Sequence, residues 1–327
     1  MNEIAVIAAG LLSTVQDGGR HGHGALGVGC AGAMDTVALR LANALVGNAQ
    51  HAAALEITLR GPRLRLRDDA VIAITGAPIQ ASCAGVALPA WQTLSVRGGS
   101  EITFGAVRRG ARSYLAIRGG IGAPLCLGSR STDLHAGIGA ALAAGDVLAC
   151  AMEPANVAPR ASGTAAAFCA AKWALDPAPW FDAADDAPIL VTRGAQFERL
   201  DAPSQHALFA QPFRIGADSN RVGYRFEGTA LALQQPYEAV SAGVVAGTLQ
   251  LPPGGAPIAL MAEAPTTGGY ARIAHIASVE LPKLAQRRPG QSVRFAEITL
   301  QQAQTRYLDR ERALAAVARH IAERLHG

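Results

Sequence analysis

The sequence predicts a mainly β protein in two parts, with few helices. It contains Gly 36 and Pro 18 among 327 residues, a composition that favours short strands joined by tight turns. Half of the residues are hydrophobic and only 17% are charged, as expected of a globular chain with a large core. At this length one core usually stops growing, so two domains of about 150 residues each are expected.

Short apolar or alternating runs recur along the chain, and Gly, Pro or Asp bounds each of them. Many short strands at this spacing are typical of a β-barrel or sandwich. The expected strands are 4–9, 54–59, 63–66, 71–75, 94–96, 101–104, 112–118 and 189–193.

Two segments have helical periodicity. Residues 34–47 are expected to form a helix with Asp35 as N-cap and Gly47 as C-cap. Its apolar positions are Val37, Leu41, Ala44 and Leu45. Residues 301–326 form a second, amphipathic pattern. Its apolar stripe comprises Tyr307, Leu314, Val317, Ile321 and Leu325.

The composition changes between the two strand-rich parts. Residues 151–188 are rich in Ala, Pro and Asp and predict a linker with one short helix. The predicted division is therefore an N-terminal part, 1–150, the linker, 151–188, a C-terminal part, 189–300, and a final helix, 301–327.

Charge and cysteine content exclude several classes of protein. The net charge is +4, but the arginines are scattered and only two lysines occur, Lys172 and Lys283, so no nucleic-acid partner is expected. The five cysteines form no C-x-x-C, which fits reduced thiols in a cytoplasmic protein. The N-terminus resembles neither a signal peptide nor a membrane anchor, so no membrane association is expected.

The first candidate site is the loop TVQDGGR at residues 14–20, followed by GAMD at 32–35. Its glycines permit a backbone that presents amide groups to an anion, and Arg20 could grip a carboxylate or phosphate. Asp17 and Asp35 are the acidic members of this group. The structural alternative is a turn in which Asp17 and Arg20 pair with each other.

The second candidate is RGGIG at 118–122 with LGSRST at 127–132. The glycine order is not that of a dinucleotide fingerprint, and no helical pattern follows it. Arg118, Ser129 and Arg130 could instead form an oxyanion pocket. The alternative is a turn at a strand end with solvated arginines.

The third candidate is GADSNRVGYRF at 216–226. Asp218 could act as a base or hold Arg221 in place. Ser219 and Asn220 are common turn residues, so a purely structural turn is the alternative.

The fourth candidate combines GTLQLPPGG at 247–255 with MAEAPTTGGY at 261–270. Glu263 ends an apolar run, and burial there would raise the pKa of its carboxyl towards the range of a general acid or base. A hydrogen-bonded structural carboxylate is the alternative. The neighbouring hydrogen-bonding residues are Gln250, Thr266, Thr267 and Tyr270. No metal site is expected, because only His21 and His23 form a histidine pair.

These four blocks, in this order and spacing, resemble the carboxyltransferase-like family that includes the C subunits of bacterial 5-oxoprolinases (KipA-type) and the second allophanate hydrolase subunit. The resemblance covers roughly residues 10–300. It implies a pair of cyclophilin-like β-barrel subdomains in tandem. It also implies an ATP-dependent opening of 5-oxoproline to glutamate, with Mg²⁺, a KipI-like B subunit and a LamB/YcsF-like protein as the third component.

Under this resemblance, Asp218 and Glu263 are the expected catalytic residues. The expected substrate-binding residues are Asp17, Arg20, Asp35, Arg118, Ser129, Arg130, Arg221, Gln250, Thr266, Thr267 and Tyr270. The chain also departs from the family pattern. Asn220 and Val222 replace Asp and Met, Glu263 and Pro265 replace Asp and Gln, Ala242 replaces an acidic residue and Ala195 replaces Pro.

Two other functions stay open at this level. One is a carboxyltransferase-type protein that acts on urea or another small amide, which would need biotin supplied in trans because the chain has no M-K-M motif. The other is a non-catalytic regulator that sequesters a KipI-like partner.

Overall fold

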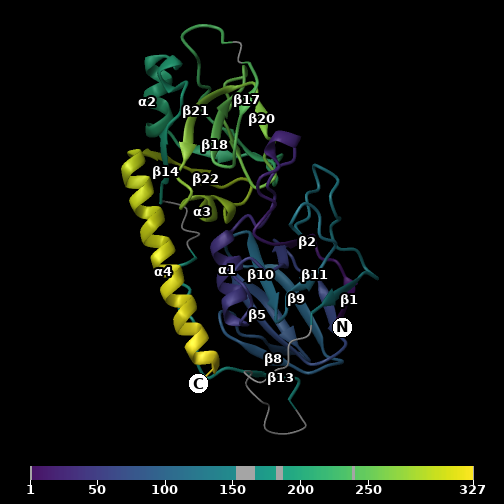
Figure 1. Cartoon of the computed structure of the whole chain (residues 1–327). Coiled ribbons are helices and arrows are strands. Elements are labelled where there is room, and N and C mark those ends of the chain that lie inside the picture. The colour runs from purple at the N-terminus through teal and green to yellow at the C-terminus, as the bar shows by residue number, and fades with distance from the viewer. Residues whose placement is uncertain (1, 152–165, 182–186, 238–239, 327) are drawn as a thin grey trace. The chain divides into compact units, whose positions relative to one another are not determined.

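The computed structural model describes residues 2–151, 166–181, 187–237 and 240–326, and the chain forms two compact units (Figure 1). Unit 1 comprises Met1–Arg20, Asp35–Asp182 and Ala313–Gly327. Unit 2 comprises His21–Met34 and Ala183–Arg312. Each unit therefore takes residues from separate stretches of the sequence.

Unit 1 contains two antiparallel sheets. The described strands of the first sheet lie in the order β11-β12-β1-β4-β9-β6-β7. Their bounds are β1 (Asn2–Ala8), β4 (Arg63–Leu66), β6 (Ile79–Cys83), β7 (Val86–Ala87), β9 (Glu101–Val107), β11 (Ile121–Gly122) and β12 (Val147–Cys150). The second sheet has the order β13-β8-β5-β10-β3-β2. Its strands are β2 (Leu12–Gln16), β3 (Ala54–Thr58), β5 (Ala70–Gly76), β8 (Leu94–Val96), β10 (Arg112–Ile117) and β13 (Phe168–Ala170).

An aliphatic core joins the two sheets of unit 1. Because side chains alternate along a strand, Leu55 and Ile57 of β3 face this core together with Leu115 and Ile117 of β10. Side chains of β1, β4 and β9 pack against them from the other sheet. The opposite face of the second sheet is covered by helix α1 (Thr36–Leu45), which lies along β5 and β10 (Figure 1).

The start of α1 agrees with the sequence prediction. The Asp35 carboxylate caps the helix by accepting a hydrogen bond from the Ala38 N–H at 2.9 Å. At the other end Val46 is the C-cap, and Gly47 follows with φ +76°, a left-handed backbone that glycine adopts without strain. Two threonines fix the helix to the sheet, since Thr75 Oγ1 and Thr93 Oγ1 donate to the carbonyls of Ala38 and Leu45.

Unit 2 is built on one sheet with the order β22-β15-β16-β19-β18-β21-β14-β23. Its strands are β14 (Ile189–Arg193), β15 (Phe213–Ile215), β16 (Gly223–Glu227), β18 (Thr248–Leu251), β19 (Ile258–Leu260), β21 (Ala271–Ile276), β22 (Ser292–Val293) and β23 (Phe295–Glu297). The first and last strands of this order, β22 and β23, are separated only by Arg294. The two edges of the sheet are thus joined by a single residue, which makes it a nearly closed barrel.

Phenylalanines fill the position where this sheet closes. The rings of Phe213, Phe226 and Phe295 come from β15, β16 and β23. The Phe226 and Phe295 centroids lie 5.3 Å apart in an edge-to-face arrangement, and Phe213 lies 5.8 Å from Phe295. Aromatic residues are only 5% of the sequence, yet this core concentrates them.

The remaining described elements are short, apart from one helix. They are α2 (Ala202–Ala210), α3 (Leu281–Ala285), the 3-10 helices at Gly24–Leu26 and Phe197–Arg199, and the strand pair β17 (Ala242–Gly243) and β20 (Thr267–Gly268). Helix α4 covers Leu300–His326, where the sequence predicts a helix over 301–326. Among the helices of the described residues, none has the length and apolar character that crossing a membrane requires.

The sequence-based expectation of a mainly β chain with few helices is confirmed. Expected strands 63–66, 94–96 and 189–193 coincide with β4, β8 and β14. In the predicted linker, residues 166–181 are described and contain β13, which pairs with β8. The rest of that linker, where a short helix is also predicted, lies largely outside the described residues.

Replacing Phe226 by Ala should destabilise unit 2, because it removes a buried ring from the position where the sheet closes. The expected loss in the free energy of unfolding is about 3–5 kcal/mol, measured by urea titration. Leu308→Ala is the control, since Leu308 is 51% exposed and should change stability by less than about 0.5 kcal/mol. Equal effects of the two substitutions would contradict the importance of this aromatic core.

Candidate functional site

The Asp17 carboxylate organises the candidate site of unit 1. Its Oδ1 accepts hydrogen bonds from Ser129 Oγ at 2.6 Å, Ser131 Oγ at 2.5 Å and the Gly19 N–H at 2.8 Å. Its Oδ2 accepts from the Arg130 N–H at 2.6 Å. Burial by itself raises the pKa of Asp17, but these donors outweigh it and hold the pKa below its ordinary value. Asp17 is therefore an ionised structural anchor, with both oxygens engaged.

Arg20 lies on the same loop and is 1% exposed. Its Nη2 donates to the Ser131 carbonyl, so Ser131 contacts Asp17 through its hydroxyl and Arg20 through its backbone. The Arg20 Nε and Nη1 atoms have no hydrogen-bond partner among the described residues. A buried guanidinium with free donors is costly unless an acceptor completes it, and a carboxylate or phosphate matches its planar fork.

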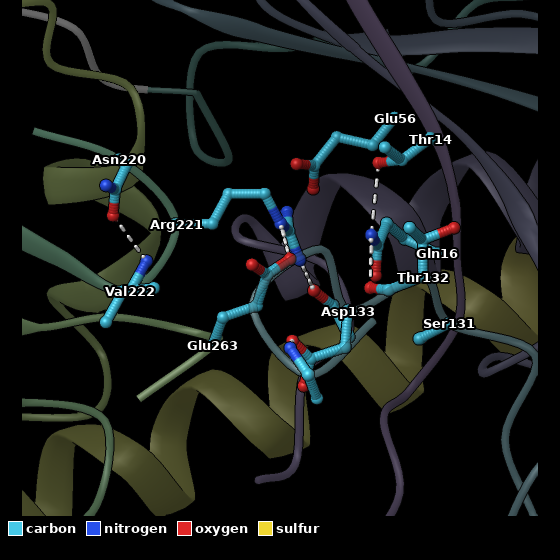
Figure 2. Close-up of polar contacts among 12 residues, drawn as sticks. Thr14, Gln16, Glu56, Ser131, Thr132, Asp133, Asn220, Arg221, Val222 and Glu263 are labelled. Carbon is cyan, nitrogen blue, oxygen red and sulfur yellow. Dashed lines mark hydrogen bonds and ion pairs between the residues drawn. The ribbon is translucent and has the colours of Figure 1, made fainter. Parts of the chain in front are cut away.

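Gln16, the last residue of β2, is a second incomplete polar group close in sequence to this loop. Its Nε2 donates to Thr14 Oγ1 and to the Thr132 carbonyl, each at 3.0 Å (Figure 2). The Gln16 Oε1 atom is buried and has no partner in the described part of the chain. Arg20 thus offers free donors, and Gln16, four residues before it, offers one free acceptor.

A buried network on the face of the sheet towards α1 was not expected from the sequence. Glu56 of β3 stands opposite Tyr114 of β10, and Tyr114 Oη donates to Glu56 Oε2 at 2.7 Å. The same hydroxyl accepts from the Asp35 N–H at 2.8 Å, and Arg112 Nε lies 3.7 Å from Glu56 Oε1. Burial, followed by the charges of Glu56 and Asp35, raises the pKa of Tyr114, so the phenol stays protonated. Glu56 within the apolar run ALEITL gives the same signal as Glu263 in IALMAE.

The second predicted motif of unit 1 divides into separate parts. Ser129 and the backbone of Arg130 join the Asp17 cluster, whereas the Arg130 side chain is exposed and donates to the Ala123 carbonyl. Arg118 is half-buried beside Gly47. A side chain at Gly119 would have its Cβ 2.0 Å from the Ala151 carbonyl oxygen. That glycine is required by close backbone packing, and it does not open a cradle for a ligand.

In unit 2, Arg221 and Glu263 form a buried ion pair. Arg221 Nε donates to Glu263 Oε1 at 2.6 Å, and the two side chains are 4% and 3% exposed (Figure 2). Arg221 Nη2 also donates to the Gly32 carbonyl at 2.6 Å, which connects residues 21–34 to the rest of this unit. Glu263 is thus engaged by a cation in this conformation, and its role in proton transfer stays a prediction.

The loop before Arg221 has the hydrogen bonds of a structural turn. Asn220 Oδ1 accepts from the Val222 N–H at 2.9 Å, and Ser219 Oγ accepts from the Arg225 N–H at 3.0 Å. Asp218 is exposed on this turn. The carboxylate that holds Arg221 is that of Glu263, so it comes from the fourth motif.

Gln250 lies beside the threonine–glycine segment of the fourth motif. It is 4% exposed, and its Nε2 has no partner among the described residues. This atom lies 2.4 Å from the position that a Cβ on Gly268 would occupy, so only glycine lets the amide approach there. The Thr266 carbonyl binds the Val244 N–H, Thr267 is exposed at the β17–β20 pair, and Tyr270 is 46% exposed.

Within the described residues, no cluster of three or more His, Cys, Asp or Glu side chains could hold a metal ion. Asp17 is poorly suited to Mg²⁺, because its two oxygens already accept hydrogen bonds from two hydroxyls and two amides. Within the four candidate motifs, the buried polar atoms without a partner among the described residues are nitrogen donors of Arg20, Arg118 and Gln250 and the Gln16 oxygen. The nitrogen donors suit an anionic or carbonyl ligand better than a cation.

The chain thus consists of two units of short strands, one a nearly closed barrel, with buried Arg and Gln side chains whose polar atoms are incompletely bonded. The chain belongs to the family "Carboxyltransferase domain, subdomain A and B", which matches residues 26–297.

Among curated relatives, the chain is 37% identical to the C subunit of 5-oxoprolinase from Escherichia coli over 327 residues, which is 99% of each protein. It is 34% identical to the corresponding 5-oxoprolinase subunit of Haemophilus influenzae over 295 residues, covering 89% of this chain and 90% of the relative.

The solved structures include urea carboxylase of Kluyveromyces lactis. It is 29% identical and has a TM-score of 0.86, and the match covers 95% of this chain but only 29% of that protein. The pair of cyclophilin-like barrels implied by the motifs is consistent with this likeness to a urea carboxylase.

Removing Glu263 should destabilise the protein strongly, because the buried Arg221 would lose the carboxylate that binds its Nε. Glu263→Ala is expected to lower the free energy of unfolding by about 3–5 kcal/mol in urea titration. The matched control is Glu227→Ala, which breaks the exposed Arg214–Glu227 pair in the same unit and should cost at most about 1 kcal/mol. A loss at Glu263 no larger than at Glu227 would contradict the importance of the buried pair.

Asp17 should make stability depend on pH in the acid range. Since its folded pKa is lowered, its contribution is complete above the unfolded pKa of about 3.9 and is lost as the pH falls through the folded value. Wild type should therefore lose its stability advantage over Asp17→Asn as the pH falls below about 4. Chemical denaturation of both proteins between neutral and acid pH measures this difference, and a constant difference would exclude the proposed ionisation.

Proposed function

We propose that this chain is the C subunit of an ATP-dependent 5-oxoprolinase that opens 5-oxoproline to glutamate. The observation that carries the proposal is the 37% identity to the C subunit of a 5-oxoprolinase across 99% of both chains. A match of this extent leaves no large part of either chain unaligned. The proposed complex also contains a KipI-like protein and a LamB/YcsF-like protein, and the enzyme is active only when all three are present.

The free donors of Arg20 support a substrate that carries an anionic group. In the proposed reaction the Arg20 fork holds the carboxylate of 5-oxoproline or a phosphoryl oxygen, while Ser131 and Asp17 keep the guanidinium in place. Gln16 Oε1 is an acceptor that a lactam N–H could satisfy. Arg20 is thus the proposed binding residue, and Asp17 is a positioning residue.

ATP with Mg²⁺, when bound in the complex, supplies the phosphoryl transfer that activates an otherwise unreactive amide. Exposed Arg130 and half-buried Arg118 are the cations of this chain proposed to contact phosphate oxygens. Because Asp17 is already engaged, Mg²⁺ is proposed to bind through phosphate oxygens, water and groups of the two partner proteins.

The test is phosphate release from ATP with 5-oxoproline, using this chain and its two purified partners. Release is expected only in the complete mixture. Arg20→Met should lower the rate by at least about 100-fold, since one charge-assisted clamp on an anion is removed. The same variant should keep its free energy of unfolding within about 1 kcal/mol, because a buried cation with free donors contributes little stability of its own.

Arg108→Ala is the control, as Arg108 is an exposed arginine of the same unit and should leave the rate unchanged. Failure of the complete mixture to release phosphate would contradict the proposed function. Full activity of an Arg20→Met complex would contradict the assigned role of Arg20 and would favour a regulatory protein that only needs to bind its KipI-like partner.

The likeness to urea carboxylase favours one alternative, a carboxyltransferase-type protein that acts on urea or a related small amide with biotin provided by another protein. Transfer of labelled bicarbonate to urea, assayed with a biotin carboxylase and a biotinyl carrier added in trans, distinguishes it. Labelled product without 5-oxoproline-dependent phosphate release would replace the first proposal by this one.

A further inference from the structure

A pocket of about 400 Å³ lies in unit 1 and shares no lining residue with the Asp17–Arg20 cluster. One wall comes from the segment after β13 and the other from the last turns of α4, whose C-terminal end is marked in Figure 1. The volume is at the small end of the range of about 300–1,000 Å³ for ligand pockets. Its lining residues are Trp173, Ala174, Leu175, Ala316, Val317, His320, Ile321 and Arg324.

Both walls are held in place by contacts outside the pocket. The Ala171 and Leu175 N–H groups donate to the carbonyls of Thr93 and Trp91 at 2.9 and 2.8 Å, which ties the first wall to the sheet. On α4, Leu325 is buried, and its Cδ1 lies 3.7 Å from the position of a Cβ on Gly47 at the end of α1. The pocket is therefore formed by a helix and a tethered strand extension, and it does not depend on a free loop.

The chemistry of the pocket separates an apolar interior from a cationic rim. Val317 and Ile321 are one helical turn apart and face the pocket with Trp173 and Leu175. His320 and Arg324, also one turn apart, supply the basic lining groups. His320 Nδ1 lies 3.6 Å from Glu323 Oε2, and Glu323 does not itself line the pocket.

The charge around the pocket favours an anionic ligand. Arg324 is exposed and permanently cationic, and none of the lining residues is acidic. An apolar tail would displace water from the wall formed by Trp173 and the helix, while a carboxylate head would remain near Arg324.

The geometry points to a binding site for a small amphiphilic carboxylate, of the aromatic or medium-chain aliphatic class. None of the lining residues belongs to the Asp17–Arg20 cluster or to the Arg221–Glu263 pair. The site is therefore separate from the proposed oxoprolinase function, and its test does not need active enzyme.

The probes are sodium octanoate, 1-octanol and octylamine, titrated into the full-length chain by calorimetry and by tryptophan fluorescence. Octanoate is expected to bind with a Kd of about 1 mM or tighter, in keeping with its few atoms. Octylamine should bind at least about tenfold more weakly than octanoate, because its head meets a cationic rim.

Two matched pairs of variants locate the site. Ala316→Trp fills the pocket and should weaken octanoate binding at least about tenfold, whereas Ala315→Trp, at an exposed position that does not line it, should not. Arg324→Gln should lower the affinity for octanoate about fivefold, because it removes one exposed ionic contact. The affinity for octanol, which has no charge, should not change. Arg319→Gln, a neighbouring exposed arginine, should leave both affinities unchanged.

Several results would overturn the inference. Wild type that binds no octanoate, or that binds octylamine equally well, excludes an anion-selective pocket. Octanoate binding that survives Ala316→Trp places the ligand elsewhere. If wild type binds no probe and Ala316→Trp instead prevents assembly with a partner protein, the pocket is a protein contact and the proposed ligand class is wrong.

Discussion

The Asp17 carboxylate is the interaction on which the site of unit 1 depends. It ties the glycine-rich loop after β2 to residues 129–131, although Asp17 and Ser129 are 112 positions apart in sequence. Because four donors converge on it, the carboxylate stays charged despite burial. That charge fixes Ser131, and Ser131 in turn orients the guanidinium of Arg20 through its carbonyl. These hydrogen bonds fix the loop, while Arg20 Nε and Nη1 stay available to donate to a ligand.

Three buried arginines of the described residues differ in how their charge is compensated. Arg221 with Glu263, and Arg112 with Glu56, are compensated within the chain and serve the packing of their units. Arg20 is different, because two of its nitrogens lack an acceptor among the described residues. An uncompensated buried cation is maintained against its own cost in stability, and binding of an anion is the most direct reason to maintain it.

Several features of the chain could be predicted from one sequence. Alternating apolar runs bounded by Gly and Pro predicted eight strands, each of which overlaps a strand of the structure, since pleat and turn preferences are local properties. The Asp35 cap was predictable for the same reason. Glu263 could be selected from the sequence because it is an acidic residue at the end of an apolar run. Its partner Arg221 could not, because it is 42 positions away and no local rule links the two residues. Glu56 carries the same signal, but its burial depends on the register with Tyr114, which is set by sheet pairing.

The sequence by itself determined the mainly β class, the Asp35 cap of α1, the extent of α4 to within one residue and the set of motifs that place the chain in its family. Only the tertiary structure decided that residues 21–34 belong with unit 2 and that 313–327 belong with unit 1. It also decided that the Asp17 carboxylate binds two serine hydroxyls and two backbone amides. Arg20 donates to the Ser131 carbonyl and does not pair with Asp17. The reason is that hydrogen bonds between distant segments depend on which strands become neighbours, whereas periodicity and turn chemistry act within a few residues of each position.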